Sequence, residues 1–211
     1  MTTDIDFTTL DTHSRYKLMA SLIVPRPIAL VTTLGADGTV NAAPFSMFNM
    51  VGEDPPLVMV SINRLHDGRL KDTAANILAT REFVVHLTDE AMVRQMHACG
   101  DALPPEQSEL PHAGLTATPS RTVAPPRIAE APVAFECVLH EVMETESRYV
   151  FFGRIQWLAA RDGLVDTARW RVHLQHYHPV GRFGASFYLG SAQRFAIDDA
   201  PGSGHTAIDS L

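Results

Sequence analysis

Short segments of β-branched and alternating residues, separated by turn signals, constrain the fold of this chain more than any other feature. The segment 27–34 is rich in β-branched residues, and Asp37-Gly38 after it supplies the left-handed backbone of a tight hairpin. We expect the chain to return over 40–46 as the partner strand. Further strands are expected at 57–62, 82–87, 133–144, 149–160, 172–178 and 186–189. Many strands joined by hairpins favour an antiparallel barrel over a doubly wound parallel sheet.

Helical spacing of apolar residues occurs in three places only. It covers 11–23, where Pro25 ends the pattern, then 70–80, and then a short segment that Thr88 or Asp89 can cap. The expected fold is therefore mainly β with peripheral helices.

A proline-rich stretch interrupts the pattern between 100 and 132, where seven of the 14 prolines fall. Because proline lacks a backbone donor, we expect little regular structure there beyond one short strand near 114–117. A loop of this length is expected to run over the surface. We expect a single domain over 1–195, followed by a flexible C-terminal tail over 196–211.

Composition excludes several classes of protein. The net charge is −7 and no basic stripe is present, so we expect no nucleic-acid partner. No apolar run approaches the roughly 20 residues that cross a bilayer, so we expect no membrane partner. The acidic start is unlike a secretory leader. The two cysteines, Cys99 and Cys137, are far apart and are expected to be buried free thiols in a cytoplasmic protein.

Several common sites are missing from the sequence. It contains no G-x-G-x-x-G after a strand, no Walker loop, no H-E-x-x-H and no G-x-S-x-G. The imidazoles of His173, His176 and His178 could offer metal ligands, with the last two on one strand face. No acidic or thiol ligand stands nearby, so we expect no metal site.

The stretch 41–49 reads NAAPFSMFN and is dense in small and amide-bearing residues at the end of a hairpin strand. Ala42, Ala43 and Ser46 let another surface approach the backbone closely. Ser46 and Asn49 can donate to and accept from the edge of a planar heterocycle such as a flavin. The alternative is an irregular strand end whose polar groups are satisfied within the chain.

A second stretch joins the end of a strand at Ser61 to a helix that begins near Asp72-Thr73. Free N–H groups and the positive end of the helix dipole make such a junction suitable for phosphate. Lys71, one of only two lysines in the chain, adds charge. The alternative is a set of solvated charges with Asp72 as a helix cap. Together, the two stretches would hold a ring with a single phosphate tail, which is the shape of FMN.

Four spaced blocks carry a resemblance to a known family. They are 25–33 (PRPIALVTT), 41–49 (NAAPFSMFN), 54–60 (DPPLVMV) and 71–76 (KDTAAN). In combination they resemble the flavin reductase-like family, whose fold is an FMN-binding split β-barrel. This family also includes flavoredoxin-like members. The block 178–184 (HPVGRFG) resembles the C-terminal motif of that family near the flavin.

The resemblance implies a homodimer with FMN at the subunit interface. It implies that Ser46, Met47, Phe48 and Asn49 line the isoalloxazine and that Ser61, Lys71 and Thr73 hold the phosphate or the ribityl chain. Arg26 and Arg182 are hypothesised to stabilise an anionic reduced flavin or to bind phosphates of the electron donor. The full set of expected cofactor-binding residues is Arg26, Thr32, Thr33, Ser46, Met47, Phe48, Asn49, Ser61, Arg69, Lys71, Asp72, Thr73 and Arg182.

The resemblance also implies an activity, that of an NAD(P)H-dependent flavin reductase. The chemistry would belong to FMN, so no catalytic side chain is expected. The sequence lacks the late Gly-Asp-His-like element that short flavin reductases associate with NADH. Two alternatives therefore stay open: a flavoredoxin-like electron carrier reduced by a protein partner, and a non-enzymatic flavin- or heme-binding module.

Overall fold

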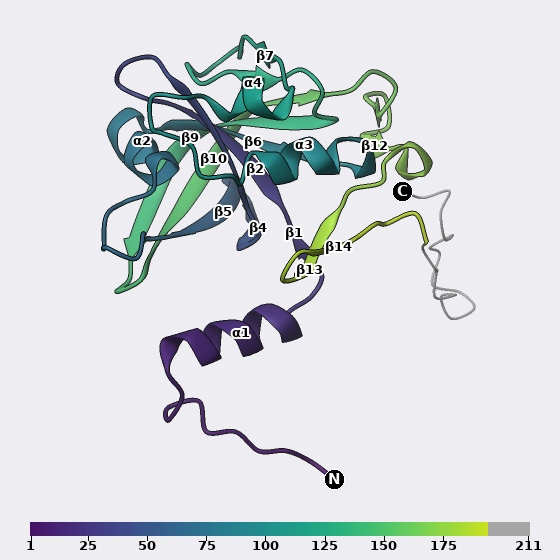
Figure 1. Cartoon of the computed structure of the whole chain (residues 1–211). Helices are drawn as coiled ribbons and strands as arrows, with labels where there is room; N and C mark the ends of the chain where they lie inside the picture. The colour runs from purple at the N-terminus through teal and green to yellow at the C-terminus, as the bar shows by residue number, and fades with distance from the viewer. Residues whose placement is uncertain (194–211) are drawn as a thin grey trace, which may run out of the picture.

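An antiparallel sheet of seven strands forms the body of the molecule, in the order β3-β2-β6-β9-β10-β5-β4 (Figure 1). The computed structural model describes residues 1–193, so the tail predicted over 196–211 lies outside the described residues. The strands of this sheet are β2 (Ala29–Leu34), β3 (Val40–Phe45), β4 (Phe48–Glu53), β5 (Pro56–Asn63), β6 (Glu82–Leu87), β9 (Val133–Glu144) and β10 (Arg148–Ala160).

Three small sheets accompany the main one. Strands β1, β13 and β14 form a three-stranded sheet between the barrel and the first helix (Figure 1). Two further pairs are β7 with β8 and β11 with β12. Their bounds are β1 (Arg26–Pro27), β7 (Ala117–Thr118), β8 (Arg127–Ile128), β11 (Val165–Asp166), β12 (Arg171–Val172), β13 (Gly181–Gly184) and β14 (Phe187–Leu189).

The helices are short and peripheral, as predicted. They are α1 (Thr12–Leu22), α2 (Asp72–Thr80), α3 (Val93–Ala98) and α4 (Glu109–Ala113), with 3-10 turns at Glu90–Met92 and Leu174–His176. The Asp11 carboxylate accepts a hydrogen bond from Ser14 N and starts α1. The Asp89 carboxylate accepts one from Ala91 N and starts the turn before α3. The three predicted helices are thereby confirmed.

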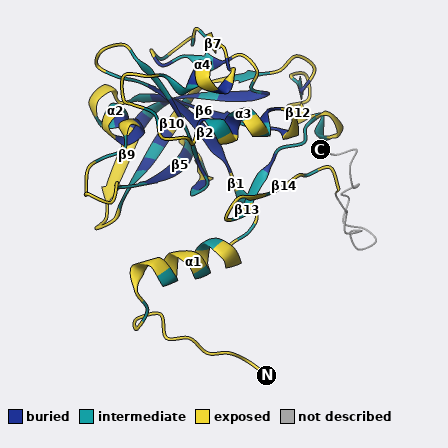
Figure 2. Cartoon of the chain, viewed as in Figure 1, coloured by how far each residue is buried: buried dark blue, intermediate teal, exposed yellow. Residues whose placement is uncertain are grey.

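Helix α1 stands away from the barrel, and none of its residues is buried (Figures 1 and 2). The guanidinium of Arg26 on β1 donates to the carbonyl oxygens of Ala20 and Ile23 at the end of α1. Carbonyls at a helix C-terminus lack intrahelical partners, so an arginine satisfies them well. This contact ties α1 to the barrel close to its own last turn.

The predicted hairpin is present between β2 and β3. Gly38 has φ of +87°, a conformation that glycine adopts without steric cost, and Asp37 Oδ1 accepts a bond from Thr39 N at 2.9 Å. Pairing of Thr33 with Asn41 and of Ala29 with Phe45 then fixes the register.

Two apolar clusters fill the interior. One lies between the curled sheet and α2, and it contains Phe83, Phe151 and Ile77, all fully buried. The other packs Met92 and Met96 against β2 and the 100–132 segment. Both free thiols are buried, as predicted. Among the described residues, no helix is long and apolar enough to cross a membrane.

The 100–132 segment is fastened by a carboxylate from the barrel. Glu136 on β9 is fully buried, and it accepts hydrogen bonds from the backbone of Arg121 and Thr122 at 2.6–3.0 Å. We expected this segment to have little regular structure, yet it contains α4 as well as β7 and β8. Ser108 caps α4 through its hydroxyl, which accepts from Leu110 N at 3.3 Å.

One strand prediction was wrong, and four observed strands were not predicted. The segment 172–178 continues β12 only to Val172 and then forms a 3-10 turn, so His176 and His178 do not share a strand face. Strands β4, β8, β11 and β13 were not predicted. Only Phe48 of β4 is buried, so the strand lacks the alternation that would indicate it.

Candidate functional site

A small cavity of about 130 Å³ lies where α1, β3, β5, α2 and β10 meet. The link between β3 and β4 contributes Ser46 and Met47, and the other polar lining residues come from strand ends and a helix start. These are Arg26, Ser61, Asn63, Lys71 and Arg148.

Strand pairing brings these residues together. In the antiparallel register of β5 and β10, Arg148 lies opposite Asn63, and Ser61 lies opposite the residue two positions after Arg148. Ser61 N donates to Met47 O at 2.8 Å, which holds the β3–β4 link against β5. Lys71 occupies the N-cap position of α2 and makes no side-chain capping bond. Its ammonium lies 5.9 Å from the centre of the Phe45 ring, and its side chain lines the cavity.

Two half-buried cations meet in this cavity without a compensating carboxylate. Burial, and after it the charge of Arg148, lowers the pKa of Lys71. Burial also lowers the pKa of the Arg148 guanidinium. Among residues 1–193, neither cation forms an ion pair, and Arg148 has only a long contact of 3.5 Å to Ser61 O. Cations held in this way favour an anionic ligand, because an anion relieves both desolvation and mutual repulsion.

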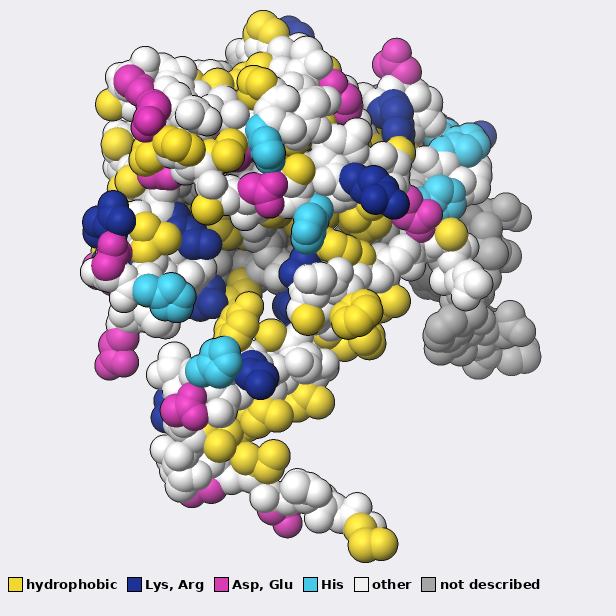
Figure 3. Space-filling view, in the orientation of Figure 1, with side chains coloured by type: hydrophobic (Ala, Val, Ile, Leu, Met, Phe, Trp, Pro, Cys, Tyr) yellow, Lys and Arg dark blue, Asp and Glu magenta, His cyan; other side chains and the backbone are white. Residues whose placement is uncertain are grey.

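A larger cavity of about 540 Å³ adjoins the first and shares with it Tyr16, Ala20, Arg26, Pro44 and Ser46. It lies between α1 and the rest of the molecule, where Figure 3 shows a hollow with Lys and Arg side chains on its walls. Its other polar lining residues are Lys17, Ser21, His97, Asp101, Arg182 and Tyr188.

Six of the thirteen expected cofactor-binding residues lie at the two cavities. Arg26, Ser46, Met47, Ser61 and Lys71 line the smaller one, and Arg182 lines the larger. Arg26 Nε donates to Ser46 Oγ at 3.5 Å, so these two side chains face each other at the boundary between the cavities.

Three expected threonines are engaged in the interior instead. Thr32 Oγ1 donates to Pro126 O at 2.6 Å and holds the 100–132 segment. Asn41 Nδ2 donates to Thr73 Oγ1 at 2.8 Å and to Thr33 Oγ1 at 3.3 Å. All three threonines are at most 1% exposed, and none lines either cavity.

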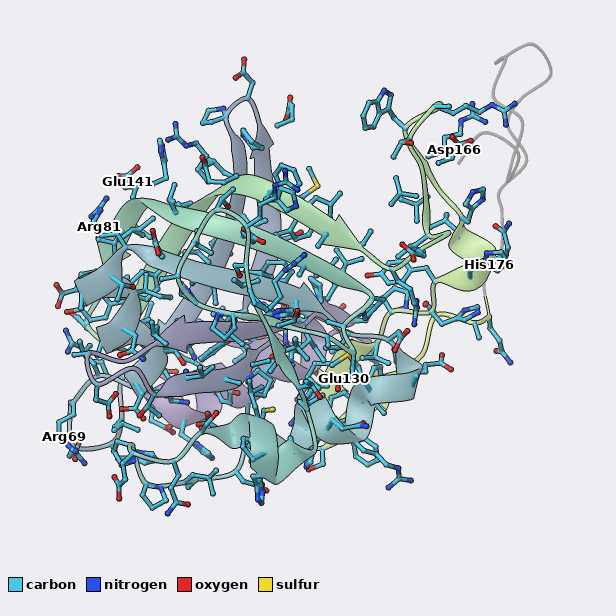
Figure 4. All side chains as sticks on the ribbon, turned by 90° about the horizontal axis from the view of Figure 1, so that it is seen from above. Arg69, Arg81, Glu130, Glu141, Asp166 and His176 are labelled. Carbon is cyan, nitrogen blue, oxygen red and sulfur yellow. The ribbon has the colours of Figure 1, made fainter. Side chains whose placement is uncertain are left out.

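The other four expected residues also lie outside the cavities. Phe48 belongs to the apolar core, and Asn49 is exposed on the edge strand β4. Asp72 is exposed in the first turn of α2. Arg69 pairs with Asp67 at 2.7 Å and points outward at the edge of the molecule (Figure 4).

Sequence reasoning missed Arg148, Asn63 and Tyr16. Arg148 follows a turn and precedes a predicted strand, where a basic residue is unremarkable. Only the register of β5 with β10 shows that it faces the end of β5. A signal for Asn63 was present, since it ends the same strand as Ser61. Tyr16 has no signal, because its position in the site depends on how α1 attaches.

Among known proteins, relatives are found in several bacteria. An uncharacterized protein from Aquifex aeolicus is 41% identical over 179 residues, which is 85% of this chain and 91% of the relative. The uncharacterized protein YwrF from Bacillus subtilis is 36% identical over 194 residues, covering 89% of this chain and 94% of YwrF.

Two solved structures are close to this one. A 2-nitrobenzoate 2-nitroreductase from Pseudomonas fluorescens superposes with a TM-score of 0.86 at 36% identity, covering 97% of this chain and 100% of its own. Component B of a nitrilotriacetate monooxygenase from Bacillus cereus superposes with a TM-score of 0.87 at 32% identity. The match covers 93% of this chain and 99% of component B. Flavoredoxin from Desulfovibrio vulgaris, at 21% identity and a TM-score of 0.72 over 97% of this chain and 100% of its own, shares the fold.

The expected mainly β split barrel is confirmed by this likeness of fold. The model of the flavin reductase like domain matches residues 19–180, which span the barrel, all of the smaller cavity's lining except Tyr16, and most of the larger cavity's lining. The chain therefore belongs to the flavin reductase-like family of split-barrel flavoproteins and is a flavin-related oxidoreductase.

Proposed function

We propose that this protein is an FMN-dependent oxidoreductase of the NAD(P)H:flavin reductase type. The observation that carries the proposal is the pair of half-buried cations, Lys71 and Arg148, that face one small cavity with no carboxylate partner among the described residues. A cavity of about 130 Å³ is small for a flavin ring and suits a phosphate group. The donor set therefore fits the single phosphate of FMN.

In this proposal each side chain has a distinct task. Lys71 and Arg148 bind the phosphate, and the hydroxyls of Ser61 and Ser46 complete its hydrogen bonds. The isoalloxazine leaves the smaller cavity past Ser46 and Met47 toward the larger one. When bound, FMN supplies two-electron transfer between a nicotinamide nucleotide and an acceptor. The protein orients the ring and keeps one face of it open to the larger cavity.

We also propose a homodimer, with FMN close to the interface. Helix α1 exposes an apolar stripe, in which Met19, Leu22 and Ile23 are 47–74% exposed. Met50 and Val51 on the edge strand β4 are exposed as well. Apolar side chains gathered on a protruding helix and a sheet edge indicate a protein contact. In a dimer, Asn49 on the same edge strand would be near the second subunit.

A second candidate is the direct reduction of a small aromatic compound on the bound flavin. It is favoured by the likeness to the Pseudomonas nitroreductase, together with a second cavity large enough for such a substrate. A flavoredoxin-like electron carrier is the third candidate function.

Two measurements test the proposal. The purified protein should show the two visible absorbance bands of oxidised flavin and should release FMN, identified by its mass, when denatured. NADH or NADPH oxidation should be followed with and without added FMN, and then with 2-nitrobenzoate as acceptor. Turnover with either nucleotide supports the reductase. Bound FMN without nucleotide turnover would favour the electron carrier, and absence of any flavin binding would refute the proposal.

A further inference from the structure

The charge around the two cavities is opposite in sign to that of the whole chain. The net charge of the protein is −7, yet five cations line the cavities, and they include both lysines of the chain. Lys71 and Arg148 border the smaller cavity, Lys17 and Arg182 border the larger one, and Arg26 borders both. This local excess of positive charge would attract and concentrate anions.

Three cations and one carboxylate line the larger cavity. The one carboxylate on its lining is that of Asp101, and Asp101 Oδ2 already accepts from His112 Nε2 at 2.8 Å. Lys17 and Arg182 make no ion pair within 1–193. Arg26 is committed to the carbonyls of α1 and to Ser46. Lys17 and Arg182 therefore remain available to a ligand.

Tyr188 on β14 orients Arg182 of β13, and His97 on α3 contacts Tyr188 in turn. Arg182 Nη1 donates to the Tyr188 hydroxyl at 2.5 Å, and the guanidinium carbon lies 4.7 Å from the centre of the Tyr188 ring. The Tyr188 hydroxyl in turn lies 2.7 Å from His97 Nδ1 on α3. An arginine placed by a hydrogen bond and by stacking keeps its remaining N–H donors in one geometry, which suits the two oxygens of a carboxylate or phosphate.

Part of the lining of this cavity is apolar. Ile28, Pro44 and Met96 contribute apolar side chains to it, and Tyr16 adds a ring from α1. A ligand that matches the cavity has an apolar, planar body and one anionic end. FMN carries a single phosphate, so a phosphate at Lys71 and Arg148 leaves the second group of cations without an anion.

We infer that Lys17 and Arg182 form a second anion subsite, which binds the carboxylate or phosphate of the co-substrate beside the flavin. Tyr188 and His97 are positioning residues in this site, since they act by orienting Arg182. The inference rests on the proposed function in one point, that the smaller cavity receives the phosphate of FMN.

The test compares benzoate with benzamide, which has nearly the same shape but no charge, and adds inorganic pyrophosphate as a second anion. Binding of benzoate, of neutral benzamide and of inorganic pyrophosphate is measured by titration calorimetry, with both FMN-loaded and flavin-free protein. The variants are Arg182→Gln and Lys17→Met, and Arg154→Gln, an exposed arginine of β10 outside both cavities, is the matched control. Retained folding is checked by circular dichroism and by FMN binding.

We expect at least one of the two anions to bind and benzamide to bind about 10-fold more weakly than benzoate. Arg182→Gln and Lys17→Met should each remove most of this discrimination, and Arg154→Gln should keep it. Preference for benzoate assigns the subsite to a carboxylated acceptor, and preference for pyrophosphate assigns it to the phosphates of a nucleotide donor. Benzamide binding as tightly as benzoate would overturn the inference, as would anion affinity unchanged by both substitutions or no anion binding at all.

A separate measurement tests whether Tyr188 orients Arg182. Tyr188→Phe keeps the aromatic ring but removes the hydroxyl that orients Arg182, so the affinity for the anion should fall while that for benzamide stays constant. Equal loss for both probes would show a merely structural role. Failure of FMN to bind, with anion discrimination intact in the flavin-free protein, would instead refute the proposed function and leave the subsite standing.

Discussion

Lys71 and Arg148 come from the start of α2 and the start of β10, yet their side chains line the same cavity. Burial, followed by the charge of Arg148, lowers the pKa of Lys71. Like charges are brought together at a cost in free energy, and a bound dianion offsets that cost. This pair is the strongest physical argument for a phosphate at this position.

Replacement of Lys71 by alanine should weaken FMN much more than riboflavin, because only FMN carries the phosphate. Loss of a charge-assisted hydrogen bond of about 1.5–3 kcal/mol corresponds to roughly a 10- to 100-fold increase in the dissociation constant. Quenching of flavin fluorescence measures both ligands. Arg154→Gln serves as the control, and an equal loss for FMN and riboflavin would remove Lys71 from the phosphate site.

His86 should make stability depend on pH. It is fully buried on β6, where its Nδ1 lies 2.9 Å from Leu30 O and its Nε2 accepts from Ile128 N at 2.9 Å. Burial lowers the pKa of this imidazole from 6.5 to about 4. In the unfolded chain the imidazole takes up a proton near pH 6.5, while in the folded protein it stays neutral. Stability is therefore complete above pH 6.5 and declines as the pH falls toward 4, by about 3 kcal/mol.

Urea unfolding at pH 7.5, 6 and 5 measures this decline. His86→Gln has no imidazole to protonate, so its stability, although lower at pH 7.5, should vary less between these pH values. A wild-type curve as flat as that of the variant would contradict the prediction.

Gly153 allows β10 to cross the core, and any side chain there should destabilise the protein. A Cβ at this position would overlap Phe83 Cζ and would lie 3.2 Å from Cys137 Cβ. Both neighbours are fully buried and cannot move aside. Gly153→Ala should therefore lower the free energy of unfolding by about 1–3 kcal/mol.

Phe83→Leu removes the overlapping ring atom and provides the internal control. The double variant should lose less stability than the sum of the two single variants, because the residues share one space. Strict additivity in chemical unfolding would argue against the overlap.

Glu136 should control the attachment of the 100–132 segment. The Glu136→Gln variant keeps the size of the side chain but turns one acceptor oxygen into a donor that faces the N–H groups of Arg121 and Thr122. We expect a loss of about 1–3 kcal/mol and faster proteolysis within 100–132. Glu141→Gln, on an exposed position of the same strand, should cleave at the wild-type rate (Figure 4).

The apolar stripe of α1 should be needed for association. Two glutamates in place of Met19 and Leu22 should convert the proposed dimer to a monomer in sedimentation velocity, since exposed apolar residues would then carry charge. His13→Glu, which places the same charge on an exposed polar position of α1, should leave the dimer intact. A wild-type chain that sediments as a monomer would refute the dimer itself.

Local sequence patterns predicted most of the fold, because the strands that fill the core follow simple rules. Segment 82–87 matches β6 residue for residue, and the Asp37-Gly38 turn formed as its chemistry requires. Strand β4 was missed because it is an exposed edge with one buried residue, Phe48. The strand predicted over 172–178 was wrong because the backbone leaves the strand after Val172 and forms a 3-10 turn. Alternation of apolar and polar residues does not reveal this change.

The site was less predictable than the fold. Residues beside a helix start or a strand end, such as Lys71, Ser61 and Ser46, could be found from local patterns. Arg148 could not, because its place depends on pairing between strands far apart in the sequence. The partners of the predicted hydroxyl residues could not be foreseen from local patterns either. Thr32 and Thr73 have the right chemistry for phosphate, but tertiary hydrogen bonds occupy them.

The loose attachment of α1 has a thermodynamic consequence. This helix buries none of its own residues, yet Tyr16 and Ala20 form part of the lining of both cavities. Ligand occupancy and helix docking are consequently linked equilibria, and each must favour the other by the same free energy. Amide hydrogens of 12–22 should exchange more slowly when ligands fill the cavities. The exchange rate of this helix therefore indicates whether a ligand is bound.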